Sequence, residues 1–231
     1  CGAGVAAILG KQPAKIVEMV AQPERTTDGF AVAWRGLNLA VRQPGAHNAL
    51  NALAAAELCA QLGYAPEKIA EALGRFGGIH RRLERVDAGG GVRVVDDYGH
   101  NPAKLAAAWA AVAAPGNRVL GVWRPHGYGP LRAMLEPLAD AFASVCRAQD
   151  KLWLLPVYDA GGTTDRSIQS DALVAKLQAR GVDAALADSY ETLGAALARA
   201  ARAGDTIMTM GARDPRLPVF AREMAAKTAH V

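Results

Sequence analysis

The spacing of apolar side chains predicts two differently built segments. Residues 29–41 (GFAVAWRGLNLAV) alternate apolar and polar positions on either side of Arg35-Gly36, which is typical of a β-hairpin with one buried face. Residues 47–63 and 65–78 then carry apolar side chains at helical intervals, which predicts two helices. The adjacent glycines Gly77-Gly78 mark the expected boundary between the two segments.

Beyond that boundary, short and nearly all-apolar stretches alternate with amphipathic ones. The expected strands are residues 92–97, 118–123, 151–157, 183–187 and 205–211. The expected helices are residues 101–114, 131–142, 170–181, 190–204 and 219–228. Buried strands separated by helices predict a parallel sheet that is covered on both faces. The expected fold class is therefore α/β, with a Rossmann-like and mostly parallel sheet.

Composition and charge narrow the class of protein. The chain has 231 residues, of which 51% are apolar, and this is enough for one large or two modest cores. No apolar run is long enough to span a bilayer. The net charge of +4 is spread along the chain, which argues against a nucleic-acid arm and suits an enzyme that handles phosphates. We expect no nucleic-acid partner and no membrane partner.

The cysteines and the first residue bear on compartment and completeness. Cys1, Cys59 and Cys146 are odd in number and widely spaced, with no CxxC pair, so they are predicted to be incidental thiols and not a zinc site. Thiols of this kind are typical of a reducing compartment, and the expected location is the cytoplasm. Because the chain does not begin with methionine, we expect a piece of a longer enzyme.

Polar side chains gather where the strand over residues 92–97 gives way to a helix. Asp97 ends the strand and His100 follows it, Asn101 is a good N-cap and Pro102 suits the first helical position. Parallel sheets bind ligands beyond the carboxyl ends of their strands, and free N–H groups at a helix start favour anions. Taken alone, this strand end fits a ligand site and an ordinary surface loop equally well.

The other strong strands end in the same way. Their ends combine glycine with charged, aromatic or imidazole side chains: Arg124, His126 and Tyr128 in RPHGYGP, Tyr158 and Asp159 in YDAGGTTDRS, and Arg213 and Asp214 in ARDP. Four such ends at one edge favour a site that handles a phosphate or a nucleotide over a purely structural role.

Five motifs occur in an order that points to a family. HNALNALAA, HRRLE, DDYGHNP, RPHGYGP and MGARD together resemble the later part of the Mur ligases, the ATP-dependent amino-acid ligases of bacterial cell-wall synthesis. The resemblance is strongest to the branch that joins L-alanine to UDP-N-acetylmuramate. It implies that residues 1–78 are the end of a central ATP-binding domain, here incomplete, and that residues 79–231 are a C-terminal Mur ligase domain.

The resemblance also implies a reaction and its partners. ATP activates the muramyl carboxylate as an acyl phosphate, which the amine of the amino acid then attacks. The implied cofactors are ATP and Mg²⁺, and the implied partners are a UDP-sugar precursor and an amino acid. We assign no metal ligands in this chain, and the sequence does not indicate an oligomeric state.

Particular residues match the family's nucleotide site. His47, Asn48 and Asn51 match the segment that lines the adenine, although Asn48 also suits an N-cap and Asn51 a polar position in a first helical turn. Arg82 matches the arginine that reaches the ATP phosphates, a task for which the planar guanidinium is suited. Asp97 matches the acid that binds the ribose hydroxyls.

Other residues match the reacting centre and its surroundings. Tyr98 and His100 match residues near the substrate phosphates, and His100 is also a candidate base towards the incoming ammonium. Arg82 and His100 are therefore the expected catalytic residues. The further expected substrate contacts are Arg124, His126, Tyr128, Arg213 and Asp214. Asp96 receives no role and is interpreted as structural.

The chain departs from the family pattern in several places. A Gly-rich loop ending in Gly-Lys-Thr is absent, because GVAAILGKQ has the wrong glycine spacing and ends in Gln12. The UDP-sugar domain is absent as well. The family's QPHRY reads RPHGY here, with Arg124 for glutamine and Gly127 for arginine, and Asn101 replaces a frequent second histidine. The substitutions in RPHGY and at Asn101 suggest a divergent subgroup and leave the amino acid that is joined open. The absence of the Gly-Lys-Thr loop predicts that the isolated chain is inactive and hydrolyses no ATP.

Two alternatives stay open at this point. One is a related ligase of the superfamily that attaches a recycled peptide or another amino acid. The other is a non-catalytic nucleotide-binding module. No GxGxxG follows a predicted strand and no GxSxG occurs, which disfavours a dinucleotide-binding oxidoreductase and a serine hydrolase.

Overall fold

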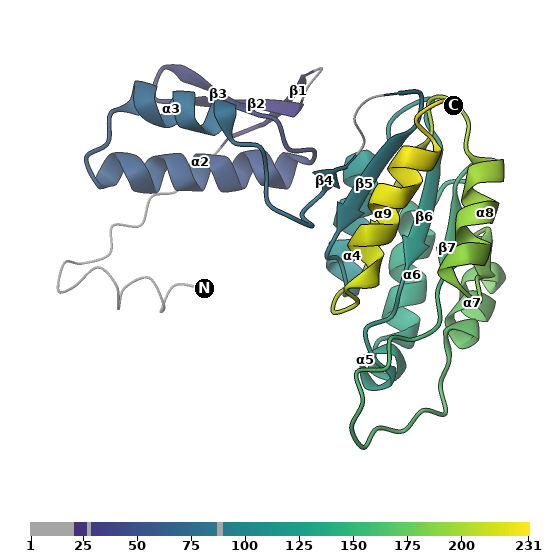
Figure 1. Cartoon of the computed structure of the whole chain (residues 1–231). Coiled ribbons are helices and arrows are strands. Elements are labelled where there is room, and N and C mark those ends of the chain that lie inside the picture. Colours follow the sequence, from purple (N-terminus) through teal and green to yellow (C-terminus); the bar gives the residue numbers. More distant parts are fainter. Residues whose placement is uncertain (1–20, 27–28, 87–89) are drawn as a thin grey trace.

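The protein was analysed as a computed structural model that describes residues 21–26, 29–86 and 90–231 (Figure 1). The GVAAILGKQ string and Cys1 lie outside the described residues. None of the described helices combines the length and the apolar content needed to cross a membrane.

The first part is a small sheet with two helices. Its elements are β1 (Glu24–Thr26), β2 (Gly29–Trp34), β3 (Leu37–Val41), α2 (Ala46–Gln61) and α3 (Pro66–Arg75). The predicted hairpin is confirmed, because β2 and β3 pair antiparallel across Arg35 and Gly36. Both turn residues have positive φ, 48° and 78°, as the favoured two-residue hairpin turn requires. Gly63 follows the end of α2 with φ 92°, which suits a helix stop.

The second part alternates strands and helices around one sheet. Its strands are β4 (Glu84–Arg85), β5 (Arg93–Asp97), β6 (Val119–Trp123), β7 (Lys151–Leu154), β8 (Ala184–Leu186) and β9 (Thr206–Met210). Its helices are α4 (Pro102–Val112), α5 (Tyr128–Ala133), α6 (Leu135–Val145), α7 (Ser170–Ala179), α8 (Tyr190–Ala200) and α9 (Arg216–Lys227). The expected α/β class is confirmed. The expected division into residues 1–78 and 79–231 stays a prediction.

The sheet is parallel except at one edge. The strand order is β4-β5-β9-β6-β7-β8, and only β4 runs antiparallel to its neighbour. The two residues of β4 are too few to show a periodic pattern, which is why the sequence did not predict this strand. β9, the last strand in the chain, lies between β5 and β6 in the ladder. This places the loops after β5, β9 and β6 next to one another.

One predicted helix was wrong. The continuous helix expected over residues 131–142 is two helices, α5 and α6, separated at Met134. Pro137 explains the break, because a proline ring clashes with the carbonyl four residues earlier and supplies no N–H. That carbonyl belongs to Ala133, the last residue of α5. The apolar periodicity runs through both helices and therefore hides the interruption.

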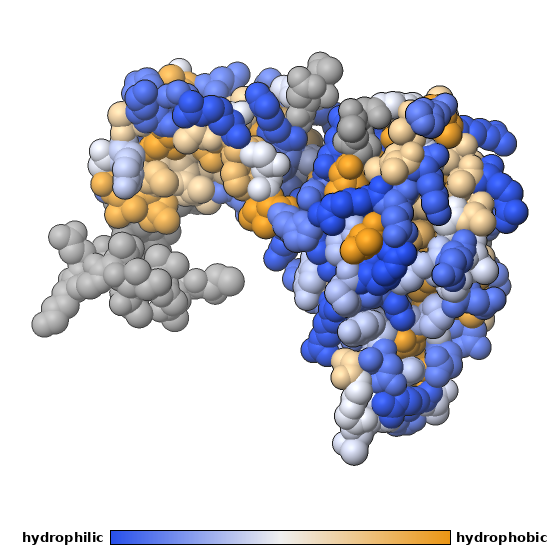
Figure 2. Space-filling view, viewed as in Figure 1, coloured by the Kyte–Doolittle hydropathy of each residue, from blue (hydrophilic) through white to orange (hydrophobic). Residues whose placement is uncertain are grey.

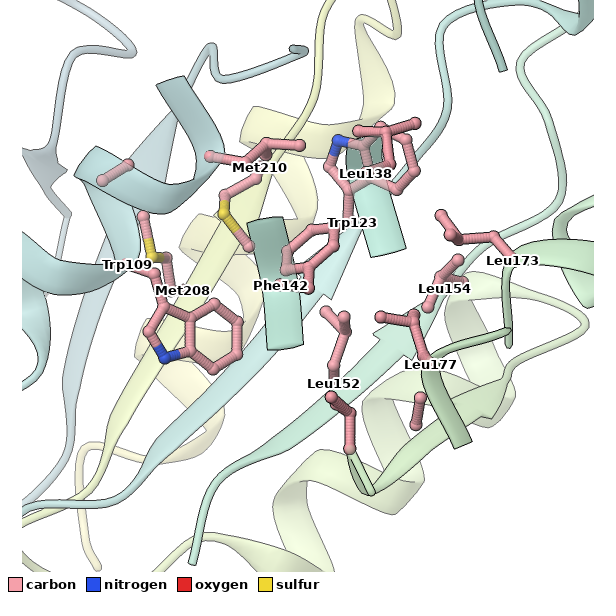
Figure 3. Close-up of a cluster of buried hydrophobic side chains, with 14 of the residues drawn as sticks. Trp109, Trp123, Leu138, Phe142, Leu152, Leu154, Leu173, Leu177, Met208 and Met210 are labelled. Carbon is pink, nitrogen blue, oxygen red and sulfur yellow. The ribbon is translucent and has the colours of Figure 1, made fainter. Parts of the chain in front are cut away.

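Apolar side chains cover both faces of the sheet. One face packs against α4, α6 and α7, where Trp109, Trp123 and Phe142 interlock by edge-to-face contacts (Figure 3). The other face packs against α8 and α9. Gly121 allows the close approach of α4, because a Cβ there would lie 2.2 Å from the Trp109 ring. The sheet is thus fixed firmly enough to hold the loops at its ends.

The surfaces of the two parts differ in polarity. Apolar side chains gather on the small part over α2 and α3, whereas hydrophilic side chains cover much of the second part (Figure 2). The exposed apolar residues of the small part include Leu62, Tyr64 and Phe76. The surface chemistry of the second part is therefore the better place to look for a polar site.

Candidate functional site

His100, His126 and Arg213 lie close together because the strands that precede them end in register. Asp97 of β5 and Trp123 of β6 both align with Met210 of β9. His100, His126 and Arg213 each lie three residues beyond one of these aligned ends. Because β9 separates β5 from β6, Arg213 follows the strand between those of the two histidines. The carboxyl edge thus carries two imidazoles and a guanidinium side by side.

The two histidines are in direct ring contact. The centroids of His100 and His126 are 5.1 Å apart in an edge-to-face arrangement, and Tyr98 packs edge-on against His100 at 5.6 Å. The His100 Nδ1 atom lies 3.0 Å from the Tyr98 carbonyl oxygen. A carbonyl only accepts, so Nδ1 carries the hydrogen and the Nε2 atom of neutral His100 is a proton acceptor.

His126 has a perturbed environment. Burial lowers the pKa of His126, and the neighbouring charges of His100 and Arg213 lower it further. A lowered pKa keeps this imidazole neutral at pH 7. The alignment of the strands places Arg213 and His100 close to His126, and their charges then lower its pKa.

Arg82 projects from a backbone segment with unusual conformation. Its neighbours Arg81 and Leu83 have φ values of 56° and 50°, a left-handed conformation that non-glycine residues adopt at a cost of about 1–3 kcal/mol each. Arg81 is anchored by Asp96 at 2.9 Å and by the Gly211 carbonyl at 2.6 Å. These contacts hold the flanking residues inward while Arg82 stays exposed.

Asp97 links this segment to the sheet edge. One Asp97 oxygen accepts the Leu83 N–H at 2.9 Å, and the other accepts the Gly99 N–H at 2.7 Å. Each carboxylate oxygen has two lone pairs, so one acceptor position on each remains for a ligand. Asp97 is 8% exposed. It fixes the position of Arg82 and remains able to accept a hydroxyl.

Asp96 faces the opposite side of the sheet. Its carboxylate is fully buried and accepts from Arg81 at 2.9 Å and from Thr209 at 2.6 Å. Burial raises the pKa of Asp96, although the hydrogen bonds from Thr209 and Arg81 oppose this. These contacts give Asp96 an internal role in holding Arg81. Sequence reasoning missed Arg81, whose only signal was its place beside Arg82 in HRRLE.

Two residues expected to contact substrate bind each other. Arg124 donates to Asp214 at 2.5 Å and to the Pro156 carbonyl at 3.1 Å, and its guanidinium lies over the Tyr158 and Tyr190 rings. Tyr190 also donates to Asp214. Burial raises the pKa of Asp214, but hydrogen bonds, first that from Tyr190, outweigh this and lower it overall. Their contact with substrate stays a prediction.

Tyr128 points into the protein at the start of α5. It is 9% exposed and belongs to the apolar cluster on the α4 side of the sheet. Arg166 lies over its ring at 5.9 Å and pairs with Asp159 at 2.7 Å. The long loop after β7 is thereby held against α5. Tyr128 takes part in this packing. Its contact with substrate stays a prediction.

The segment predicted to line an adenine lies elsewhere. His47 and Asn51 are exposed in the first turns of α2. Asn48 is not the N-cap that one interpretation expected, because Gly45 occupies that position with φ 93° and the Asn48 amide donates to the Pro44 carbonyl at 2.7 Å. The apolar helix pattern does not reveal where the first turn begins, and this caused the error.

The distance between the two groups of residues follows from α4. A Cβ on Gly45 would lie 3.3 Å from Ala111, in the last turn of α4, whereas His100 precedes the first turn. The 11 residues of α4 span about 16 Å at 1.5 Å per residue. The structure therefore brings Arg82, Asp97, Tyr98, His100, His126 and Arg213 to one edge, and places His47, Asn48 and Asn51 near the other end of α4.

The fold is an α/β domain, and the carboxyl edge of its sheet carries exposed arginines beside two imidazoles. A sequence model of the "Mur ligase, glutamate ligase domain" matches residues 81–213. The UDP-N-acetylmuramate–L-alanine ligase of Syntrophotalea carbinolica is 36% identical over 200 residues, which cover 84% of this chain and 42% of that protein. The chain belongs to the Mur ligase family.

Solved structures agree on the fold. The UDP-N-acetylmuramate–alanine ligase of Thermotoga maritima matches with a TM-score of 0.67 at 23% identity, over 86% of this chain and 42% of that one. A murein peptide ligase of Psychrobacter arcticus matches with a TM-score of 0.54 at 18% identity, over 91% and 44%. The chain spans less than half the length of each of these three relatives. The family resemblance seen in the five motifs is thus confirmed.

Proposed function

We propose that this chain is the later part of an ATP-dependent ligase that joins L-alanine or a related amino acid to UDP-N-acetylmuramate. The observation that carries the proposal is the position of Arg82. Its guanidinium is exposed at the carboxyl edge, on a segment that Asp97 and Asp96 hold in place. A cation held in place without an ion-pair partner among the described residues suits the phosphates of a nucleotide.

The residues at the carboxyl edge divide the work by their chemistry. Arg82 would hold the phosphates, and Asp97 would accept the ribose hydroxyls with its remaining lone pairs. ATP supplies the phosphoryl group that activates the muramyl carboxylate. Fixed charges of this kind contribute by positioning and by stabilising developing charge. The described residues contain no group of three or more His, Cys, Asp or Glu side chains suited to a metal, so we assign Mg²⁺ no ligand here.

His100 suits the second half of the reaction. The ammonium of the amino acid must lose a proton before its nitrogen lone pair attacks the activated carbonyl carbon. The C–N bond then forms as the C–O bond to phosphate breaks, and phosphate leaves. The His100 Nε2 atom is the proton acceptor at the edge, because the hydrogen of this ring is on Nδ1 towards the Tyr98 carbonyl. His126 in contact supports the ring's orientation.

The test is turnover by the full-length protein. Phosphate release from ATP is measured in wild type and in Arg82→Ala. UDP-N-acetylmuramate is present in every assay, and the acceptor is either one of a panel of amino acids or a muramyl peptide fragment. We expect the change to lower ATP-dependent amide formation by about 100- to 1,000-fold, the usual loss on removing a preorganised charge. The folded structure should persist, because the Arg82 side chain is exposed and has no hydrogen bond or ion pair with the described residues.

Arg75→Ala is the matched control, because Arg75 is an exposed arginine on α3 whose partner is Glu71. The control should retain wild-type turnover. Unchanged turnover in Arg82→Ala would remove the proposed phosphate role. Turnover with the peptide and not with free amino acids would favour the peptide-attaching alternative.

A further inference from the structure

We propose that Arg213 binds the carboxylate of the incoming amino acid and thereby selects an α-amino acid as the acceptor. This rests on the proposed function, because it names the acceptor chemistry of the same edge. The observations that support it are the placement of Arg213, the glycine at position 127, and the ion pair that fixes the Arg213 loop.

The Arg213 backbone has an unusual conformation, and the side chain is exposed. Its φ is 67°, a left-handed conformation that a non-glycine residue rarely adopts without a reason in the surrounding structure. The side chain is exposed, and the described residues give it neither a hydrogen bond nor an ion pair. An unpaired guanidinium with five donors in a fixed fork is matched to a carboxylate.

The neighbouring loop lacks a cation that the family pattern provides. The family's QPHRY carries an arginine where this chain has Gly127. Gly127 has φ 151°, a conformation that favours glycine, so the loop is built without a side chain at that position. Arg213 lies on the adjoining loop and acts electrostatically on His126, the residue before Gly127. The cation is therefore supplied from the β9 loop.

The Arg124–Asp214 pair sets the position of this cation. Arg124 begins the loop that leads to His126, and Asp214 directly follows Arg213. Their side chains bond at 2.5 Å, and the second Asp214 oxygen accepts the Arg216 N–H at 2.9 Å at the start of α9. The pair thus ties the two loops together. Arg124 and Asp214 are positioning residues for Arg213 and do not need to touch the substrate.

The chemistry of the acceptor follows from the two groups that face it. The His100 Nε2 atom accepts a proton, which suits the ammonium, while Arg213 binds an anion. His100 and Arg213 follow adjacent, register-aligned strands. A zwitterion with its ammonium and carboxylate on one carbon satisfies both, whereas a simple amine leaves Arg213 without a partner.

The test compares acceptors that differ only in this carboxylate. Ligation by the full-length protein is measured with L-alanine and L-alaninamide, in wild type, Arg213→Ala and Arg213→Lys. We expect Arg213→Ala to raise the KM for L-alanine by about 10- to 100-fold, the effect of losing a charge-assisted pair, and to leave the KM for L-alaninamide within about twofold. Arg213→Lys should recover part of the loss, because the charge remains without the fork.

Arg202→Ala is the matched control, because Arg202 is an exposed arginine at the opposite edge of the sheet. It should not change either KM. An equal loss for L-alanine and L-alaninamide in Arg213→Ala would overturn the carboxylate role while leaving the ligase function intact. If wild type forms no amide with any acceptor, the proposed function fails.

Binding without turnover decides the inference in that case. Saturation-transfer NMR on the same protein measures the affinity for L-alanine and L-alaninamide directly. Weaker binding of L-alanine alone in Arg213→Ala supports the carboxylate role. Equal binding of both molecules by wild type and Arg213→Ala overturns it.

Discussion

The two edges of the sheet use their charges differently. At the amino edge, Asp150 is buried and accepts hydrogen bonds from Arg147 and from the Val119 N–H. At the carboxyl edge, Arg82 and Arg213 are exposed and lack ion-pair partners among the described residues. Both edges carry arginines, but Arg147 is paired with Asp150 whereas Arg82 and Arg213 have no ion pair among the described residues. A charge with internal partners stabilises the fold, whereas a fixed charge without them is available to a ligand.

Backbone conformation separates the edges in a second way. Among the described residues, the non-glycine positions with positive φ are Arg35, Arg81, Leu83 and Arg213. Arg35 forms the hairpin turn, and the others belong to the carboxyl edge. Strain of this kind persists only where the surrounding contacts overdetermine it, and it is typical of functional sites. The comparison of the edges therefore predicts which substitutions change stability and which change binding.

Asp150→Ala gives the largest expected effect on stability. It leaves the Arg147 side chain and the Val119 and Arg147 N–H groups without their acceptor. We expect the free energy of unfolding to fall by about 3–5 kcal/mol, the range for removing one member of a buried pair. Urea unfolding monitored by circular dichroism measures this. Arg82→Ala is the comparison at the other edge and should change stability by less than about 0.5 kcal/mol.

The same carboxylate predicts a pH dependence. Burial raises the pKa of Asp150, but hydrogen bonds, first those from the Arg147 side chain, outweigh this and lower the pKa below its ordinary 3.8. Its contribution is therefore present above that value and is lost as the pH falls through the lowered pKa. The stability difference between wild type and Asp150→Ala should shrink on acidification below about pH 4. A difference that grew there would contradict the assignment.

Arg124→Gln tests the ion pair that joins two loops of the carboxyl edge. The change restores the residue of the family's QPHRY pattern but leaves the buried Asp214 without its cation. We expect a loss of about 2 kcal/mol in unfolding free energy, with part of it recovered in Arg124→Gln/Asp214→Asn. Strictly additive losses in the double variant would show that the two residues do not act as a pair.

The smallest expected effect is electrostatic. Burial and the charges of His100 and Arg213 lower the pKa of His126, so Arg213→Ala should raise that pKa. Titration of the imidazole ring protons by NMR measures the change, with Arg202→Ala as control. An unchanged or lower pKa would place the Arg213 charge away from His126.

The sequence predicted the strand ends well for a physical reason. Period-two and 3.6 patterns identify buried strands and helices, and the rule that parallel strands share one carboxyl edge then places their end residues together. His100 and His126 were brought to one edge in this way. The Asn101 N-cap also followed from local chemistry, and its side chain accepts the Lys104 N–H at 3.0 Å.

The remaining details depend on contacts that a periodic pattern does not contain. Arg124 and Asp214 are 90 residues apart, so nothing local indicates that they bind each other instead of a ligand. The Tyr190 hydroxyl on Asp214 was missed for the same reason. The interruption at Pro137 was visible in the sequence, but the apolar periodicity outweighed it. Contacts between residues far apart in the chain are thus what the local sequence pattern does not predict.

The equal spacing beyond the three strands has a consequence for how this edge could diversify. His100, His126 and Arg213 each stand three residues past an aligned strand end. One inserted residue would advance a side chain by up to about 3.3 Å, far beyond the roughly 1 Å that a reacting geometry tolerates. Exchanging a side chain at fixed loop length leaves its neighbours in place. New acceptor preferences would therefore arise by substitution of residues in these loops and not by insertion or deletion.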